Sequence, residues 1–335
     1  MMSRILFPTL LAAAATAHAE DRVTVQTDSG AGKIVVVGTV LDWNGRTVRI
    51  KSGDGLRELP AVRVVDVETP RIESHHNGLA ALDAGKPGEA LPLLKKALAE
   101  EPRLWMRREI LAALIRTNLA LGDRAAAGTD FLALLDSDPA TRHFELIPLD
   151  WQTDPPDAAL VAAARGWLKT ADSDAAKLLA ASCLLFDPLK GNDAAETLGR
   201  LATSIDSRIY PLARAQLWRR QLKKGNVAEG EIARWEDRLD EIPEPLRGGA
   251  WWLVGQAWAD RGSAERAATA LLWLPLVYDA DARLAAEATV NAADQLTRIG
   301  RTADAVVLYR EATTRFGFTP AAKRAAATLE RLAGK

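Results

Sequence analysis

The chain has 335 residues, of which 48% are hydrophobic and 26% are charged, a composition typical of a folded globular protein. The formal net charge is −1 and no long run of one sign occurs, which argues against a nucleic-acid-binding protein and against a polybasic membrane protein. The length suffices for two domains, or for a repeat array with a cap.

Residues 1–19 have the pattern of a secretory signal peptide. Arg4 supplies a positive charge, residues 5–16 form an apolar run rich in Leu and Ala, and Ala17-His18-Ala19 has the small-x-small form of a cleavage site. The apolar run is too short to remain as a membrane-spanning helix. We therefore expect a mature chain that begins near Glu20, is periplasmic or extracellular, and has no integral membrane segment.

Cys183 is the single cysteine and lies within the apolar helical stretch 178–186. An intramolecular disulfide is therefore impossible, and export does not imply a disulfide framework here. We expect Cys183 to be a small buried hydrophobic residue.

Residues 20–70 are predicted to form a small β-barrel of four or five short strands. Residues 33–41 are rich in β-branched side chains, and 46–51 and 62–67 alternate polar and apolar residues, as strands with one buried face do. Asn44-Gly45 predicts a tight hairpin turn in which both residues take positive φ. Gly53-Asp54-Gly55 predicts a second turn, before a short strand at 56–59.

One spacing of mostly small residues recurs three times in residues 71–335. Successive members are 7, 5, 4 and 3 residues apart in all three copies, and the first and last copies add a further 5: Gly78, Gly85, Ala90, Leu94, Ala97 and Pro102; Gly255, Gly262, Ala267, Leu271 and Leu274; Ala293, Gly300, Ala305, Tyr309, Ala312 and Gly317. Small residues at these offsets are what two short antiparallel helices need to pack closely, pair after pair. The spacing predicts a mainly α fold, a right-handed α-solenoid of helix pairs.

The clearest copy contains residues 251–258, Trp-Trp-Leu-Val-Gly-Gln-Ala-Trp. This segment resembles the Trp-x-x-Leu-Gly-x-x-Tyr pattern of the tetratricopeptide repeat family, with Val and Trp as substitutes. The family period is about 34 residues, whereas Gly225, Gly262 and Gly300 are 37 and 38 residues apart, so we expect longer loops between pairs. The hairpin at 38–45 resembles the SH3-like barrels of bacterial envelope proteins.

The middle of the array departs from the pattern. Ile115 and Trp218 stand where a small residue is expected. Residues 141–156 contain three prolines and no periodicity, which predicts an irregular connection. Asp157 can then cap a helix that runs to about Lys169.

The family resemblance implies that the first helices of successive pairs line a concave groove that binds an extended peptide or protein segment. The groove positions of the family correspond here to Arg116, Arg219, Lys223, Trp252, Gln256, Asp260, Asp294 and Arg298. For Trp252 the alternative is a core tryptophan beside Trp251, and for the charged residues it is an ordinary solvated helix face. The chain has ten tryptophans, which either stack against a ligand or fill gaps between alanine-rich helices.

Residue types and motifs that support catalysis or metal binding are scarce in the sequence. His75, His76 and His143 are the histidines outside residues 1–19, and no His-x-x-x-His, Cys-x-x-Cys, phosphate-binding loop or Gly-x-Ser-x-Gly motif occurs. We therefore expect no enzymatic activity, no catalytic or metal-binding residue and no cofactor.

Three functions remain open from the sequence. The first is an exported scaffold that binds a protein or peptide partner in its groove, with no nucleic acid involved. The second is a structural or assembly component of the cell envelope without a discrete ligand. The third is a glycan or peptidoglycan binder that acts through the N-terminal barrel, although Trp43 is the only aromatic residue there.

Overall fold

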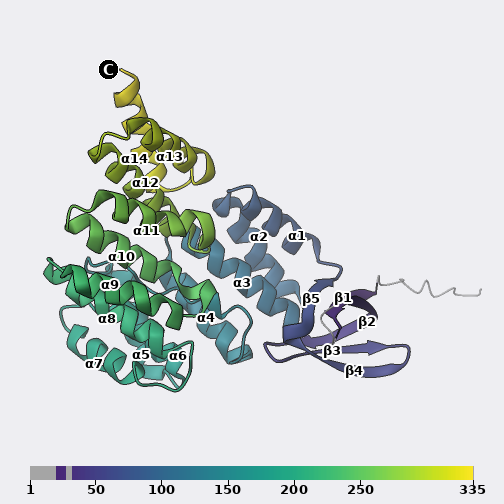
Figure 1. Cartoon of the computed structure of the whole chain (residues 1–335). Helices are drawn as coiled ribbons and strands as arrows, with labels where there is room; N and C mark the ends of the chain where they lie inside the picture. The colour runs from purple at the N-terminus through teal and green to yellow at the C-terminus, as the bar shows by residue number, and fades with distance from the viewer. Residues whose placement is uncertain (1–19, 28–31, 335) are drawn as a thin grey trace, which may run out of the picture. The chain divides into compact units, whose positions relative to one another are not determined.

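The computed structural model describes residues 20–27 and 32–334, which form two compact units divided between Arg71 and Ile72. The expected signal peptide lies outside the described residues. The second unit is helical and the first is a small antiparallel sheet (Figure 1). Within the described part of the chain, no helix combines the length and the apolarity that a membrane crossing requires.

The first unit is a five-stranded antiparallel sheet with the strand order β4-β3-β2-β1-β5. Alternation along the strands places one set of valines and an isoleucine inside: Val23, Val25, Val36, Val40, Val48, Ile50 and Val67 are each at most 6% exposed. The strands are β1 (Asp21–Gln26), β2 (Lys33–Trp43), β3 (Thr47–Ser52), β4 (Gly55–Pro60) and β5 (Val64–Glu68), with a 3₁₀ turn η1 (Ala61–Arg63) before β5.

The turn between β2 and β3 differs from its prediction. Neither Asn44 nor Gly45 has a positive φ. Instead, the side-chain oxygen of Asn44 accepts hydrogen bonds from the backbone N–H groups of Arg46 and Thr47, both at 2.9 Å. The asparagine therefore closes the turn through its side chain, so the positive-φ geometry expected of Asn-Gly is wrong here.

The second unit contains fourteen α-helices between residues 72 and 334. Most consecutive helices pack against each other along the chain, and α3 also contacts α12 (Figure 1). The helices are α1 (Glu73–Asp83), α2 (Pro87–Glu100), α3 (Leu104–Leu121), α4 (Arg124–Ser137), α5 (Ala158–Thr170), α6 (Asp174–Leu184), α7 (Gly191–Leu201), α8 (Tyr210–Lys224), α9 (Glu229–Asp237), α10 (Gly248–Asp260), α11 (Ala264–Val277), α12 (Ala282–Arg298), α13 (Thr302–Arg315) and α14 (Pro320–Ala333).

The recurring spacing corresponds to a recurring contact between paired helices. A Cβ atom on Gly78 would lie 2.8 Å from the Leu94 side chain, and one on Gly255 would lie 2.6 Å from Leu271. Both glycines stand sixteen residues before the leucine, so the same small-to-large contact closes α1 on α2 and α10 on α11. The turn glycines of the pattern have positive φ: Gly85, Gly122, Gly225, Gly262 and Gly300.

The packing changes where the pattern is interrupted. Trp218 on α8 stacks on Trp235 of α9, with ring centroids 5.1 Å apart and planes 2° apart. Two indole rings between the helices prevent the close backbone approach that a glycine permits. Asp157 caps α5 as expected, because its side chain accepts a hydrogen bond from Leu160 N at 2.8 Å.

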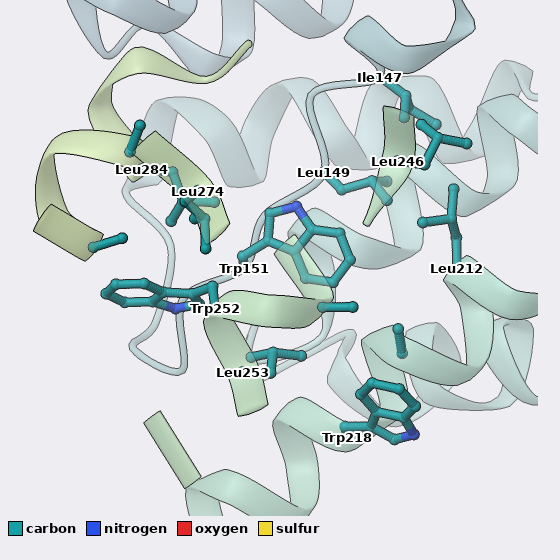
Figure 2. Close-up of a cluster of buried hydrophobic side chains, with 14 of the residues drawn as sticks. Ile147, Leu149, Trp151, Leu212, Trp218, Leu246, Trp252, Leu253, Leu274 and Leu284 are labelled. Atoms are coloured by element: carbon teal, nitrogen blue, oxygen red, sulfur yellow. The ribbon is translucent and has the colours of Figure 1, made fainter. Parts of the chain in front are cut away.

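Residues 141–156 are irregular as expected, and most of their central part is buried. A short 3₁₀ turn, η2 (Phe144–Leu146), is followed by Leu149 at 1% and Trp151 at 7% exposure. Figure 2 shows these two side chains in a hydrophobic cluster with Leu212 of α8 and Leu253 of α10. The connection is therefore part of the core of the helical unit.

Candidate functional site

The helical unit has an open cleft of about 940 Å³. It is formed by the end of α1, by α3, by the η2 turn, and by the segments before α12 and after α13. We call it the central cleft and define it by Leu79, Leu82, Asp83, Arg116, Glu145, Asp279, Arg315 and Phe318.

Arg116 is one of the basic residues that the sequence placed in the groove, and it lines the central cleft. It is exposed on α3, and its guanidinium has no hydrogen-bond or ion-pair partner among the described residues. Arg315 is different, because its guanidinium is 2.5 Å from Asp279 and also donates to the carbonyl of Pro275. Arg116 is therefore the cleft cation whose hydrogen-bonding groups are available to a ligand.

The cleft also offers apolar contact. Leu79 and Leu82 on α1 and Phe318 after α13 are half-buried and line this depression. Asp83 and Glu145 add carboxylates near them. The combination of half-buried apolar side chains with a few charges is what a groove for a protein segment requires.

A smaller cavity of about 60 Å³ shares Glu145, Leu146 and Ala280 with the central cleft. In its wall, Arg124 of α4 pairs with Asp281 at 3.0 Å and donates to the carbonyl of Leu149 at 2.7 Å. Burial alone would lower the pKa of Arg124, but the carboxylates of Asp281 and Asp150 outweigh it and raise this pKa above its usual value. Arg124 therefore keeps its charge beside Asp281, in the wall of the smaller cavity.

Arg219 was expected in the groove, but the structure places it in the core with no exposed surface. Its guanidinium donates to the carbonyls of Gln152 and Ser182 at 2.9 and 2.8 Å, and to Asp150 Oδ2 at 2.9 Å. Burial lowers its pKa. The expectation that Arg219 is exposed is therefore wrong, and its role is to hold the buried connection.

Trp252 is 6% exposed and belongs to the hydrophobic core, so the expectation of an exposed aromatic anchor is also wrong. Figure 2 shows it in the cluster that contains Trp151 and Leu253. The alternative interpretation from the sequence, a core tryptophan, is the correct one.

The remaining candidates lie outside the central cleft. Lys223 is exposed beside Asp154 at 3.9 Å and lies over the Phe186 ring. Gln256 is half-buried on α10, and Asp260 is exposed at its end, where partial burial raises the pKa of this carboxyl. Asp294 accepts a hydrogen bond from the Tyr309 hydroxyl at 2.5 Å, and Arg298 donates to Gln295. Of the eight candidates, the structure brings only Arg116 into the central cleft.

Reasoning from the sequence missed the other cleft residues because they come from segments far apart in the chain. Glu145 lies in the irregular connection, and Asp279 and Phe318 lie in loops between helices. The family pattern describes helix pairs and says nothing of these loops, so no signal in the sequence pointed to them.

Groups with catalytic potential are few in the described residues. Cys183 is 1% exposed, and burial raises its pKa to about 12, so its thiol is protonated at neutral pH. No group of three or more His, Cys, Asp or Glu side chains with metal-binding geometry occurs among residues 20–27 and 32–334.

A comparison of the chain with models of known protein families and with curated proteins finds no match.

Proposed function

We propose that this chain is an exported protein-interaction scaffold of tetratricopeptide type, which holds an extended segment of a partner protein in the central cleft. The observation that carries the proposal is Arg116, an exposed cation with no partner among residues 20–27 and 32–334, in the same cleft as the half-buried Leu82 and Phe318. In this proposal the chain has no catalytic role and needs no cofactor.

The helical packing supports the family part of the proposal. The pairs α1–α2 and α10–α11 repeat one glycine-to-leucine contact, and the turn glycine of each pair has positive φ. Such repeated contacts are the basis of solenoid folds, in which each pair buries its apolar face on the next. The order β4-β3-β2-β1-β5, with a 3₁₀ turn before β5, supports an SH3-like barrel at residues 20–70. The signal pattern in residues 1–19 supports the export part of the proposal.

The chemistry of the cleft limits the segment that it can hold. A carboxylate of the partner would pair with Arg116, and an apolar side chain next to it would contact Leu82 and Phe318. We therefore propose a segment with an acidic residue beside an apolar one.

The test uses a photo-reactive amino acid at position 82 of the mature protein, which is irradiated in extract of the cell envelope. We expect one dominant crosslinked partner, and Arg116→Glu should abolish the crosslink by reversing the charge. Arg310→Glu is the matched control, because Arg310 is exposed on α13 outside the cleft and has no side-chain partner among the described residues. Equal crosslinking of wild type and Arg116→Glu would disprove the proposal.

A further inference from the structure

A second groove lies between α9, α10 and α11 and contains none of the candidates from the sequence. We call it the Trp groove and define it by Glu229, Glu236, Trp251, Glu265, Arg266 and Trp273. Its volume is about 680 Å³. It shares no residue with the central cleft.

One aromatic ring in the wall of the Trp groove, that of Trp273, is open to solvent. Trp273 is 40% exposed and stacks on Trp251, with ring centroids 5.3 Å apart and planes 17° apart. Leu276 and Val277, at the end of the same helix, are 70% and 48% exposed. A large aromatic ring held in place by stacking while it is exposed is a typical contact for a binding partner.

Carboxylates surround these rings. Glu229, Glu236 and Glu265 face Arg266 as the only basic residue of the groove. Glu265 is exposed and its carboxylate has no partner among the described residues. Because the net charge of the whole chain is only −1, this concentration of negative charge is local.

The groove already holds one cation of its own. The guanidinium of Arg266 lies 4.5 Å from the centroid of the Trp258 ring and pairs with Glu229 at 2.6 Å. Trp258 in turn donates its indole N–H to Glu236 at 2.8 Å, which fixes the ring. A cation held between an indole face and a carboxylate is therefore stable on this surface.

Glu265 and Trp273 offer the same kinds of group, a carboxylate and an indole ring, to two separate cations from outside. They lie eight residues apart on α11, which is about 12 Å along the helix axis. About four residues of an extended chain span this distance. We propose that the Trp groove binds an extended basic segment of a partner protein, with one Arg or Lys over Trp273 and another paired with Glu265. This site is independent of the central cleft.

The probe is an eight-residue peptide of alternating Arg and Ala, acetylated and amidated, with binding measured by calorimetry and by tryptophan fluorescence. The same peptide with citrulline in place of Arg keeps the shape and removes the charge. We expect binding of the Arg peptide that weakens as salt increases, because surface charges are screened. Binding of the citrulline peptide should be at least about tenfold weaker, as expected when cation–π and ion-pair contacts are lost.

Three variants separate the groove from general charge effects. Trp273→Ala should weaken binding by about tenfold, and Glu265→Gln by about threefold. Glu330→Gln, an exposed carboxylate on α14 without a partner among the described residues, should leave binding unchanged. Since Glu265 is exposed, its variant tests the site without risk to folding. The inference would be overturned if both peptides bound equally well, or if Glu265→Gln and Trp273→Ala bound the Arg peptide as tightly as the wild type does. Neither result would bear on the proposed role of Arg116 in the central cleft.

Discussion

At the scale of single residues, the guanidinium of Arg219 explains how a polar chain segment can lie inside a helical core. All five of its N–H groups donate, to the carbonyl oxygens of Gln152 and Ser182, to Asp150 and to Gln216. A buried carbonyl without a donor costs about 1–3 kcal/mol. One side chain therefore satisfies several groups at once, and a lysine could not, because it lacks the planar fork.

Arg219→Met should destabilise the helical unit by about 3–5 kcal/mol, because it leaves the Asp150 carboxylate buried without its cation. Urea unfolding measures the difference. Arg310→Met, at an exposed site, should change stability by less than about 0.5 kcal/mol. If Arg219→Met lowered the free energy of unfolding by less than about 1 kcal/mol, water would reach Asp150 in the folded protein.

Asp130 on α4 makes stability depend on pH. Burial raises its pKa from 3.8 to about 6, although Asn118 donates a hydrogen bond to it at 2.8 Å. The folded state therefore binds this proton more tightly than the unfolded state does. The stability that the protonated carboxyl contributes is fully present below pH 3.8 and is lost as the pH rises through about 6. Asp130→Asn should therefore be more stable than wild type above pH 6, and the difference should vanish at pH 3.8 and below. Thermal unfolding across this range tests it, and a constant difference would contradict it.

At the scale of elements, the connection 141–152 is held by side chains from four helices. Glu109 of α3 binds Arg142 and His143, Arg124 of α4 binds Leu149, Ser182 of α6 binds Asp150, and Arg219 of α8 binds Gln152. Burial favours the neutral form of Glu109, but the hydrogen bonds from His143 and Arg142 outweigh it and lower the pKa of this carboxyl. Apart from the short η2 turn, the segment lacks regular secondary structure, yet side chains hold it at several points along its length.

Gly249→Ala tests the packing of this connection on α10. A Cβ atom at position 249 would lie 1.8 Å from Cε2 of Trp151, so one of the two must move. We expect a loss of about 1–3 kcal/mol in the free energy of unfolding. Gly199→Ala on α7 is the matched control, because nothing lies within 4 Å of its Cβ position, and it should gain about 0.5–1 kcal/mol from helix propensity. If Gly249→Ala and Gly199→Ala raised the free energy of unfolding by similar amounts, Trp151 would not be packed against α10.

The regular elements could be predicted because their causes are local. The sixteen-residue step from Gly78 to Leu94 and from Gly255 to Leu271 sets one helix crossing, and Asp157 caps the helix that follows it. The role of Arg219 could not be predicted, because its partners are 37 and 67 residues away. The sequence found the candidate site only at Arg116, since the other cleft residues come from α1, from α13 and from loops that only tertiary packing brings together.

At the scale of the helical unit, two contacts join parts of the chain that are more than 150 residues apart. Arg124 pairs with Asp281, and Arg283 donates to the carbonyl of Leu121 at 2.9 Å. Gly122 has the room for this second contact, because a Cβ there would lie 1.7 Å from the Arg283 guanidinium. The start of α4 and the start of α12 therefore stabilise each other, beside the central cleft.

Arg124→Gln should loosen this junction without unfolding the whole unit. It removes the ion pair and the bond to Leu149, at a cost of about 1.5–3 kcal/mol for hydrogen bonds of a charged group, while Asp281 still caps α12 through Leu284 N. Hydrogen exchange should accelerate at residues 144–149 and at the first turn of α12, and stay unchanged in α7, because regions open separately when their local contacts differ. Arg200→Gln, which breaks an exposed pair within α7, should alter neither region. If Arg124→Gln accelerated exchange equally in α7, the helices would open as one cooperative unit. The junction would then unfold together with the rest of the helical unit.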